Sequence, residues 1–138
     1  MKTLFAKPLL TIIILTAIAF IYACSGASPE YRTYENKLRD QMQEMINVLN
    51  AAHYNEFMST YADPSYISSM GGVDKALLEF GNKEQQQLIR DLKVSKNITP
   101  LYSEKNKEMT YISELLKVPV VFKMKNNKWY LQGDWFRQ

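Results

Sequence analysis

The fold is decided near the end of the chain, by the stretch Val118-Pro119-Val120-Val121-Phe122-Lys123-Met124-Lys125-Asn126-Asn127-Lys128-Trp129-Tyr130-Leu131-Gln132-Gly133-Asp134-Trp135. Asparagine tolerates the positive φ that a two-residue hairpin turn requires, so we place the turn at Asn126-Asn127. This turn predicts pairs that are apolar or contain Gly: Met124 with Trp129, Phe122 with Leu131, Val120 with Gly133, and Val118 with Trp135. The pairs between them, Lys125 with Lys128, Lys123 with Tyr130 and Val121 with Gln132, form a largely polar face. A slip of one residue would bury the lysines, so the register is well specified.

Two shorter strands are expected before this hairpin. Alternating patterns predict strands at Ile98–Tyr102 and Met109–Ser113, joined by a polar turn at Glu104–Lys107. The sheet is therefore antiparallel, and its apolar face needs a cover.

Helical patterns fill the chain before the strands. Ser28 can cap a long helix and Pro29 suits its first turn. Apolar residues then recur at helical spacing: Tyr31, Tyr34, Leu38, Met42, Met45, Leu49 and Ala52. Shorter helices are expected at Glu56–Tyr61, at Ser65–Met70 and from Val73 to about Val94, the last broken at Gly81. Helices followed by an antiparallel sheet predict an α+β domain, with the long helix packed on the sheet.

The beginning of the chain has the pattern of a secretory signal. Residues 1–7 carry two lysines and no acid, and residues 8–23 are uncharged and mostly apolar. A permanent transmembrane helix is the rival interpretation. We expect a cleaved signal peptide at 1–23, a short tether at 24–29 and a single domain at 30–138. One domain is what the remaining 115 of the 138 residues can support.

Cys24 is the only cysteine, and it lies where the apolar run ends, in Ile21-Tyr22-Ala23-Cys24-Ser25. This segment resembles a bacterial lipobox, with a small residue before the cysteine and a branched aliphatic residue three places before it. The resemblance implies that Cys24 becomes a lipidated N-terminus carrying acyl chains such as palmitate, and that Ser25 favours the outer over the inner membrane. The alternative is an incidental thiol at the end of an ordinary signal or anchor.

Charge and motifs exclude several functions. The net charge of +3 falls to +1 once Lys2 and Lys7 are removed. The nearest approach to a basic cluster is Lys117, Lys123, Lys125 and Lys128, which we assign to a solvated side of the hairpin, so no nucleic-acid partner is expected. The sequence has no Gly-rich phosphate loop, no metal-ligand pair and no Gly-x-Ser-x-Gly motif, so we expect no cofactor and no metal site.

Two stretches carry a resemblance to a fold family. Leu49-Asn50-Ala51-Ala52-His53-Tyr54-Asn55-Glu56-Phe57 is similar to the junction of the first two helices in bacterial members of the nuclear transport factor 2-like (SnoaL-like, cystatin-like) superfamily. The segment from Val121 to Leu131 is similar to their terminal hairpin. The resemblance implies a cone-like domain with a curved sheet. It does not supply a function, because this fold serves enzymes and binding proteins alike.

Two functions remain open from the sequence. We favour a membrane-anchored, non-catalytic binding or accessory domain at the periplasmic side of the bacterial cell envelope, with an envelope protein or a small apolar ligand as partner. The alternative is a small cone-fold enzyme acting on an apolar molecule. Its weak catalytic candidates are His53, the only histidine, and Asp63, together with a pocket tyrosine. A local hydrogen-bonding role as a helix cap is the simpler interpretation of His53.

Overall fold

The computed structural model describes residues 28–138, and the compact unit that holds the sheet is Thr33–Gln138. The described α-helices are α2 (Pro29–Asn50), α3 (Tyr54–Tyr61), α4 (Pro64–Met70), α5 (Val73–Glu79) and α6 (Asn82–Ser95). The strands are β1 (Leu101–Ser103), β2 (Glu108–Tyr111), β3 (Val120–Lys125) and β4 (Lys128–Leu131), followed by a 3-10 helix, η1 (Gly133–Arg137). This order confirms the predicted α+β class.

The four strands form one antiparallel sheet in the order β1-β2-β3-β4. The predicted hairpin register is confirmed: Met124 lies opposite Trp129 and Phe122 opposite Leu131. Both turn residues have positive φ, 51° at Asn126 and 60° at Asn127. The asparagines thus set the turn, and the turn sets which face of each strand is buried.

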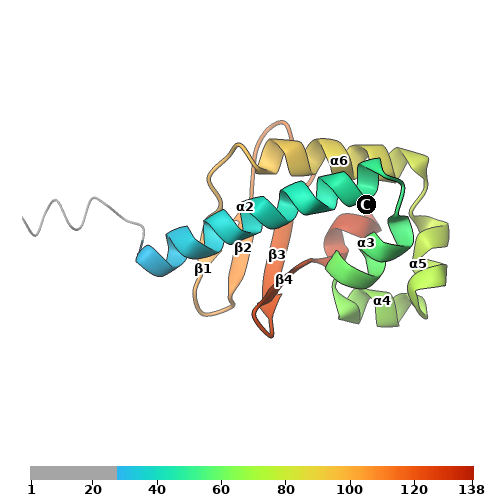
Figure 1. Ribbon diagram of the computed structural model, residues 1–138, viewed down its shortest axis with the longest axis horizontal. Coiled ribbons are helices and arrows are strands. Elements are labelled where there is room, and N and C mark those ends of the chain that lie inside the picture. The colour runs from blue at the N-terminus through green and yellow to red at the C-terminus, as the bar shows by residue number, and fades with distance from the viewer. Residues whose placement is uncertain (1–27) are drawn as a thin grey trace, which may run out of the picture. The chain divides into compact units, whose positions relative to one another are not determined.

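Helices α2 and α6 cover one face of the sheet, as Figure 1 shows. Gln41 of α2 donates from Nε2 to the carbonyl of Trp129 at 2.7 Å, and the Tyr34 ring meets the Trp129 ring edge-on. Lys96, at the end of α6, donates to Gln43 of α2. The core between these helices and the sheet contains the middle of the predicted α2 stripe, while Tyr31 and Tyr34 at its start are half-buried. Its residues are Leu38, Met42, Met45, Leu49, Leu88, Leu92, Met109, Phe122, Trp129 and Leu131.

The helix boundaries follow the expected local signals. Ser28 Oγ accepts from the backbone N–H of Tyr31 at 3.1 Å, as a cap should. Gly71 closes α4 in the left-handed conformation, with φ 84°. The chain breaks between α5 and α6 at Phe80 and Gly81, as predicted. Ala52, expected at the end of the apolar stripe, lies instead outside α2 and is exposed, with φ 58°.

Three predicted strand boundaries are wrong. The first strand is Leu101–Ser103 rather than Ile98–Tyr102, because the Ile98 N–H bonds back to the Ser95 carbonyl and continues the turn after α6. The second is Glu108–Tyr111. The last strand ends at Leu131, so Gly133 and Trp135 do not pair with Val120 and Val118. The Asp63 N–H donates to the Leu131 carbonyl at 2.9 Å, so that Ala62 lies beside Leu131 in an isolated parallel bridge, and the chain then leaves the sheet as η1.

Candidate functional site

Cys24, the predicted lipidation site, lies outside the described residues, as do the proposed signal peptide and the first part of the tether. Within residues 28–138, no helix has both the length and the apolar character needed to cross a bilayer.

His53 lies at the surface, at the start of α3. It occupies the residue before the first helical turn, but its side chain makes no capping hydrogen bond. The side chain is 62% exposed, and its Nδ1 lies 3.4 Å from Oε2 of Glu56. His53 therefore occupies the N-cap position of α3, as predicted, but its imidazole does not cap the helix.

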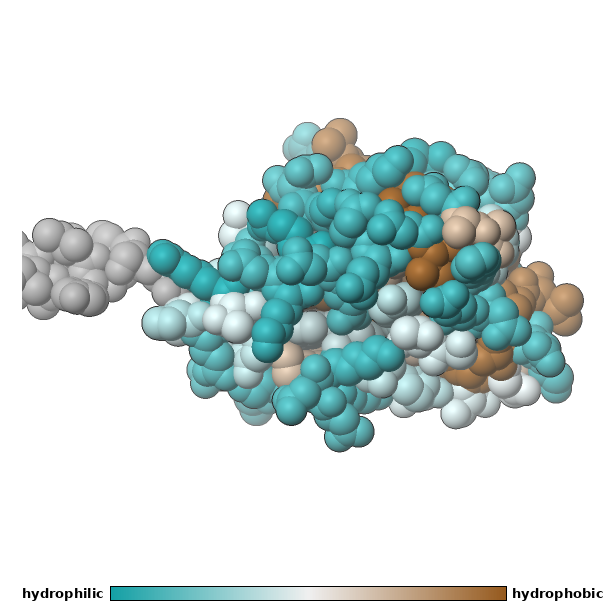
Figure 2. Space-filling model, in the orientation of Figure 1, coloured by the Kyte–Doolittle hydropathy of each residue, from teal (hydrophilic) through white to brown (hydrophobic). Residues whose placement is uncertain are grey.

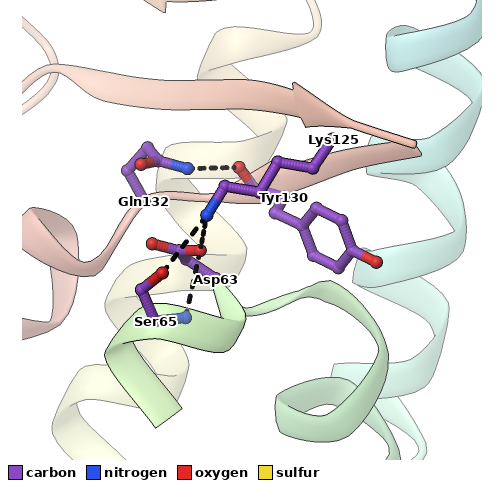
Figure 3. A network of polar contacts seen from close by, with 5 residues as sticks. All are labelled: Asp63, Ser65, Lys125, Tyr130 and Gln132. Atoms are coloured by element: carbon purple, nitrogen blue, oxygen red, sulfur yellow. Dashed lines mark hydrogen bonds and ion pairs between the residues drawn. The ribbon is translucent and has the colours of Figure 1, made fainter. Parts of the chain in front are cut away.

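Asp63 belongs to a polar network between α4 and the terminal hairpin, drawn in Figure 3. Its carboxylate is nearly buried, and Oδ1 accepts from Lys125 Nζ at 2.7 Å and from the Ser65 N–H at 3.3 Å. Lys125 also donates to Ser65 Oγ at 3.3 Å. Asp63 thus caps α4 and fastens it to β3. The structure does not bring His53 and Asp63 together, since each faces a different partner.

Two tyrosines, Tyr61 of α3 and Tyr130 of β4, lie beside Lys128 of the hairpin. The Lys128 ammonium lies 5.7 Å from the Tyr61 ring centre and 5.3 Å from that of Tyr130. Burial raises the pKa of the Tyr61 hydroxyl, and the neighbouring carboxylates Glu44 and Glu56 raise it further. The phenol therefore stays neutral at physiological pH and acts here as a packing and hydrogen-bonding group.

A pocket opens elsewhere, between the start of α6 and the C-terminal segment. Its volume is about 170 Å³ and it is partly open to solvent, so it is smaller than the roughly 300–1,000 Å³ of drug-sized ligand sites and fits only a small molecule. Its lining combines lysines, amides, one acid and two aromatic rings: Lys83, Glu84, Gln87, Lys117, Trp135, Phe136 and Gln138. A pocket that joins aromatic walls to a few polar groups is suited to binding an organic molecule.

A buried carboxylate holds the wall of this pocket in place. Asp91, on the inner face of α6, is only 1% exposed. Its Oδ2 accepts from Nε1 of Trp135 at 2.9 Å, and its Oδ1 accepts from Nε2 of Gln87 at 2.7 Å. Arg90 in turn donates to Oε1 of Gln87 at 2.8 Å. Both oxygens of Asp91 are thus used to orient two residues that line the pocket.

Aromatic packing fixes the second ring of the wall. Phe136 stacks on Tyr66 of α4, with ring centres 4.7 Å apart and planes 10° apart, and it meets Trp135 edge-on at 5.4 Å. Gly133 allows this approach, because a Cβ at that position would lie 2.9 Å from the Cβ of Tyr66. Burial also raises the pKa of Tyr66; nearby Arg137 lowers it and Glu79 raises it, with a net increase.

This site was not predicted from the sequence. Trp135 was expected in a strand, and Asp91 was not among the candidate residues. A signal was present: Asp91 lies three residues after Leu88 and four before Ser95, so helical periodicity places its carboxylate on the buried face. A buried acid on such a face needs donors, which the two pocket residues supply.

Metal ligands do not gather in the described part of the chain. Residues 28–138 contain no group of three or more His, Cys, Asp or Glu side chains placed to hold a metal ion.

Comparison of the chain with protein-family models, with curated proteins and with solved structures finds no match.

Proposed function

We propose that this chain is a lipid-anchored, non-catalytic binding domain of the bacterial cell envelope, and that it binds its ligand in the pocket between α6 and η1. The observation that carries the binding role is the pocket wall: a buried carboxylate, Asp91, is used to orient Trp135 and Gln87 toward one cavity. Burying a charge is costly unless it is well paired, so a wall held in this way favours a maintained cavity over a packing gap.

The anchor is proposed from the sequence around Cys24. A basic start, an uncharged apolar run and Ala23-Cys24 together have the pattern of a lipoprotein signal. Several acyl chains on one residue hold a protein at a membrane far more firmly than a single chain does. With the outer membrane as the favoured location, the tether would keep the pocket close to the bilayer surface.

We also propose the relationship to the nuclear transport factor 2-like superfamily, with its cone-like, curved sheet. The supporting features are the long helix α2, the short α3 that follows it and the terminal hairpin with Trp129.

The enzyme alternative needs His53 and Asp63 at one cavity. Neither residue lines the pocket, His53 faces Glu56, and Asp63 is bonded to Lys125 and Ser65. The binding domain is therefore the function we put forward.

The anchor is tested by replacing Cys24 with Ser and fractionating cells, with Ser25→Ala as the matched control. We expect the Cys24→Ser chain to lose the lipid and to leave the membrane pellet or to remain unprocessed. A Cys24→Ser chain that still reaches its mature size and stays in the pellet would overturn the lipid anchor.

The binding role is tested by purifying the full chain from membranes and identifying bound small molecules by native mass spectrometry. Glu84→Trp places an indole in the pocket, whereas Lys93→Trp places the same ring elsewhere on the exposed side of α6. We expect a bound molecule with the unchanged chain and with Lys93→Trp, and its loss with Glu84→Trp. Absence of any bound molecule, or equal recovery from both variants, would contradict binding in this pocket.

A further inference from the structure

The charges at the pocket are unequal. Lys83 and Lys117 line it and are exposed, and within residues 28–138 neither ammonium has a hydrogen-bond or ion-pair partner. Among the described residues, Glu84 is the only acid that lines the pocket, and the Asp91 carboxylate behind the wall is 1% exposed and has both oxygens bonded to Trp135 and Gln87. Two unpaired ammonium groups from different segments, one on α6 and one before β3, therefore point to a negatively charged occupant.

The amide of Gln87 adds a donor and not an acceptor. An ionised carboxylate only accepts hydrogen bonds, so the contact with Asp91 fixes which end of the amide is the nitrogen. The carbonyl end is already used by Arg90. One N–H of the Gln87 amide remains, which increases the pocket's capacity to bind an acceptor group.

The aromatic wall offers apolar surface, most of it from the partly exposed ring of Phe136, and no free hydrogen-bonding group. The indole N–H of Trp135 is used by Asp91, and the residue is 4% exposed. Phe136 is held between Tyr66 and Trp135. Because both rings are fixed by their partners, little side-chain entropy is lost when a flat apolar group packs against them.

From these three features we infer that the pocket binds a small organic anion, one that carries a planar apolar group next to a carboxylate, sulfonate or phosphate. The anionic group lies between Lys83 and Lys117, and the planar group packs on the partly exposed ring of Phe136, beside the small exposed edge of Trp135. This inference rests on the proposed function, because it names the chemical class of the ligand of the same pocket.

The test uses three probes that share one ring system and differ in charge: 2-naphthoate, neutral 2-naphthamide and cationic 2-naphthylmethylamine. The full chain is labelled with ¹⁵N and purified in a nonionic detergent, and the indole N–H signals of its two tryptophans are followed by NMR. Trp135 reports on the pocket, while Trp129, which does not line it, is the internal reference. A Trp129→Phe chain assigns the two signals.

We expect 2-naphthoate to shift the Trp135 signal in a saturable manner and to leave the Trp129 signal in place. The neutral and cationic probes should bind about fivefold more weakly, since ion pairs with exposed lysines contribute modest energies. Lys83→Gln and Lys117→Gln should each weaken 2-naphthoate by about two- to fivefold, whereas Lys93→Gln on the exposed side of α6 should have no effect.

Two outcomes would overturn the inference, and they differ in what they mean for the proposed function. Equal binding of the three probes, or no effect of the two lysine substitutions, would refute an anionic ligand while leaving the pocket as a binding site. Absence of a Trp135 shift with every probe would refute the inference, and the bound-molecule analysis with Glu84→Trp then decides separately whether the pocket binds anything.

Discussion

The buried carboxylate of Asp91 makes a measurable prediction about stability. Hydrogen bonds to a charged group contribute about 1.5–3 kcal/mol each, and burial of the charge offsets part of that gain. Asp91→Ala removes the acceptor of the Trp135 indole, and a buried donor without a partner costs about 1–3 kcal/mol. It also frees the Gln87 amide and leaves a small cavity. We expect the free energy of unfolding to fall by about 2–4 kcal/mol.

Urea unfolding followed by far-UV circular dichroism measures this loss. Asp134→Ala is the matched control, because that carboxylate is 95% exposed and lies 3.9 Å from Arg137, so its loss should change stability by less than about 0.5 kcal/mol. Trp135→Phe keeps most of the ring and removes the N–H. In a double-mutant cycle, Asp91→Ala and Trp135→Phe should be coupled by about 1.5–3 kcal/mol. A coupling energy near zero would refute the role assigned to the contact.

Three further predictions concern the core, a close approach and alkaline pH. Trp129→Ala should lower the free energy of unfolding by about 3–5 kcal/mol and Lys123→Ala by less than about 0.5 kcal/mol; equal losses in urea would contradict the hairpin register. Gly133→Ala should cost about 1–3 kcal/mol, because its Cβ would lie 2.9 Å from the Cβ of Tyr66; an unchanged thermal melt would argue against this approach. Burial raises the pKa of Tyr61 and Tyr66 above the ordinary 10.0, so unfolded chains release these protons first. The stability contributed by the neutral phenols is full below pH 10.0 and is lost as the pH rises through the raised pKa values. Between about pH 9 and about pH 11, the Tyr66→Phe chain should therefore lose less free energy of unfolding than the unchanged chain. An identical loss in the two chains would count against a buried Tyr66 phenol.

The part of the fold that could be predicted is the part where side-chain alternation and turn chemistry agree. At Asn126-Asn127, the turn and the apolar pairs beside it specify the same register, and the structure has that register. The end of β4 could not be predicted in this way. Gly133 and Trp135 continue the apolar alternation, yet they are buried from a 3-10 helix: the Trp135 N–H bonds back to the Gln132 carbonyl, and its indole bonds to Asp91 of α6. The alternation of apolar residues alone does not distinguish a continued β4 strand from the 3-10 helix η1.

The pocket was harder to predict than the fold, because its residues come from segments that are distant in sequence. Lys83 and Gln87 belong to α6, Lys117 to the loop before β3, and Trp135 to η1. No spacing rule joins these positions. Asp91 was the accessible signal, since a charge on a buried helix face requires donors from elsewhere in the chain.

The bond between Asp91 and Trp135 spans 44 residues, and this separation has a consequence for synthesis. A chain made from its N-terminus completes α6 well before the indole that satisfies the second oxygen of Asp91. Until then the helix carries a carboxylate on the side that enters the core, which opposes stable docking. Chains that stop before Trp135 keep this defect, so we expect them to remain open to proteolysis while full-length chains become resistant. Synthesis of η1, which carries Trp135, is therefore the step after which α6 can dock stably.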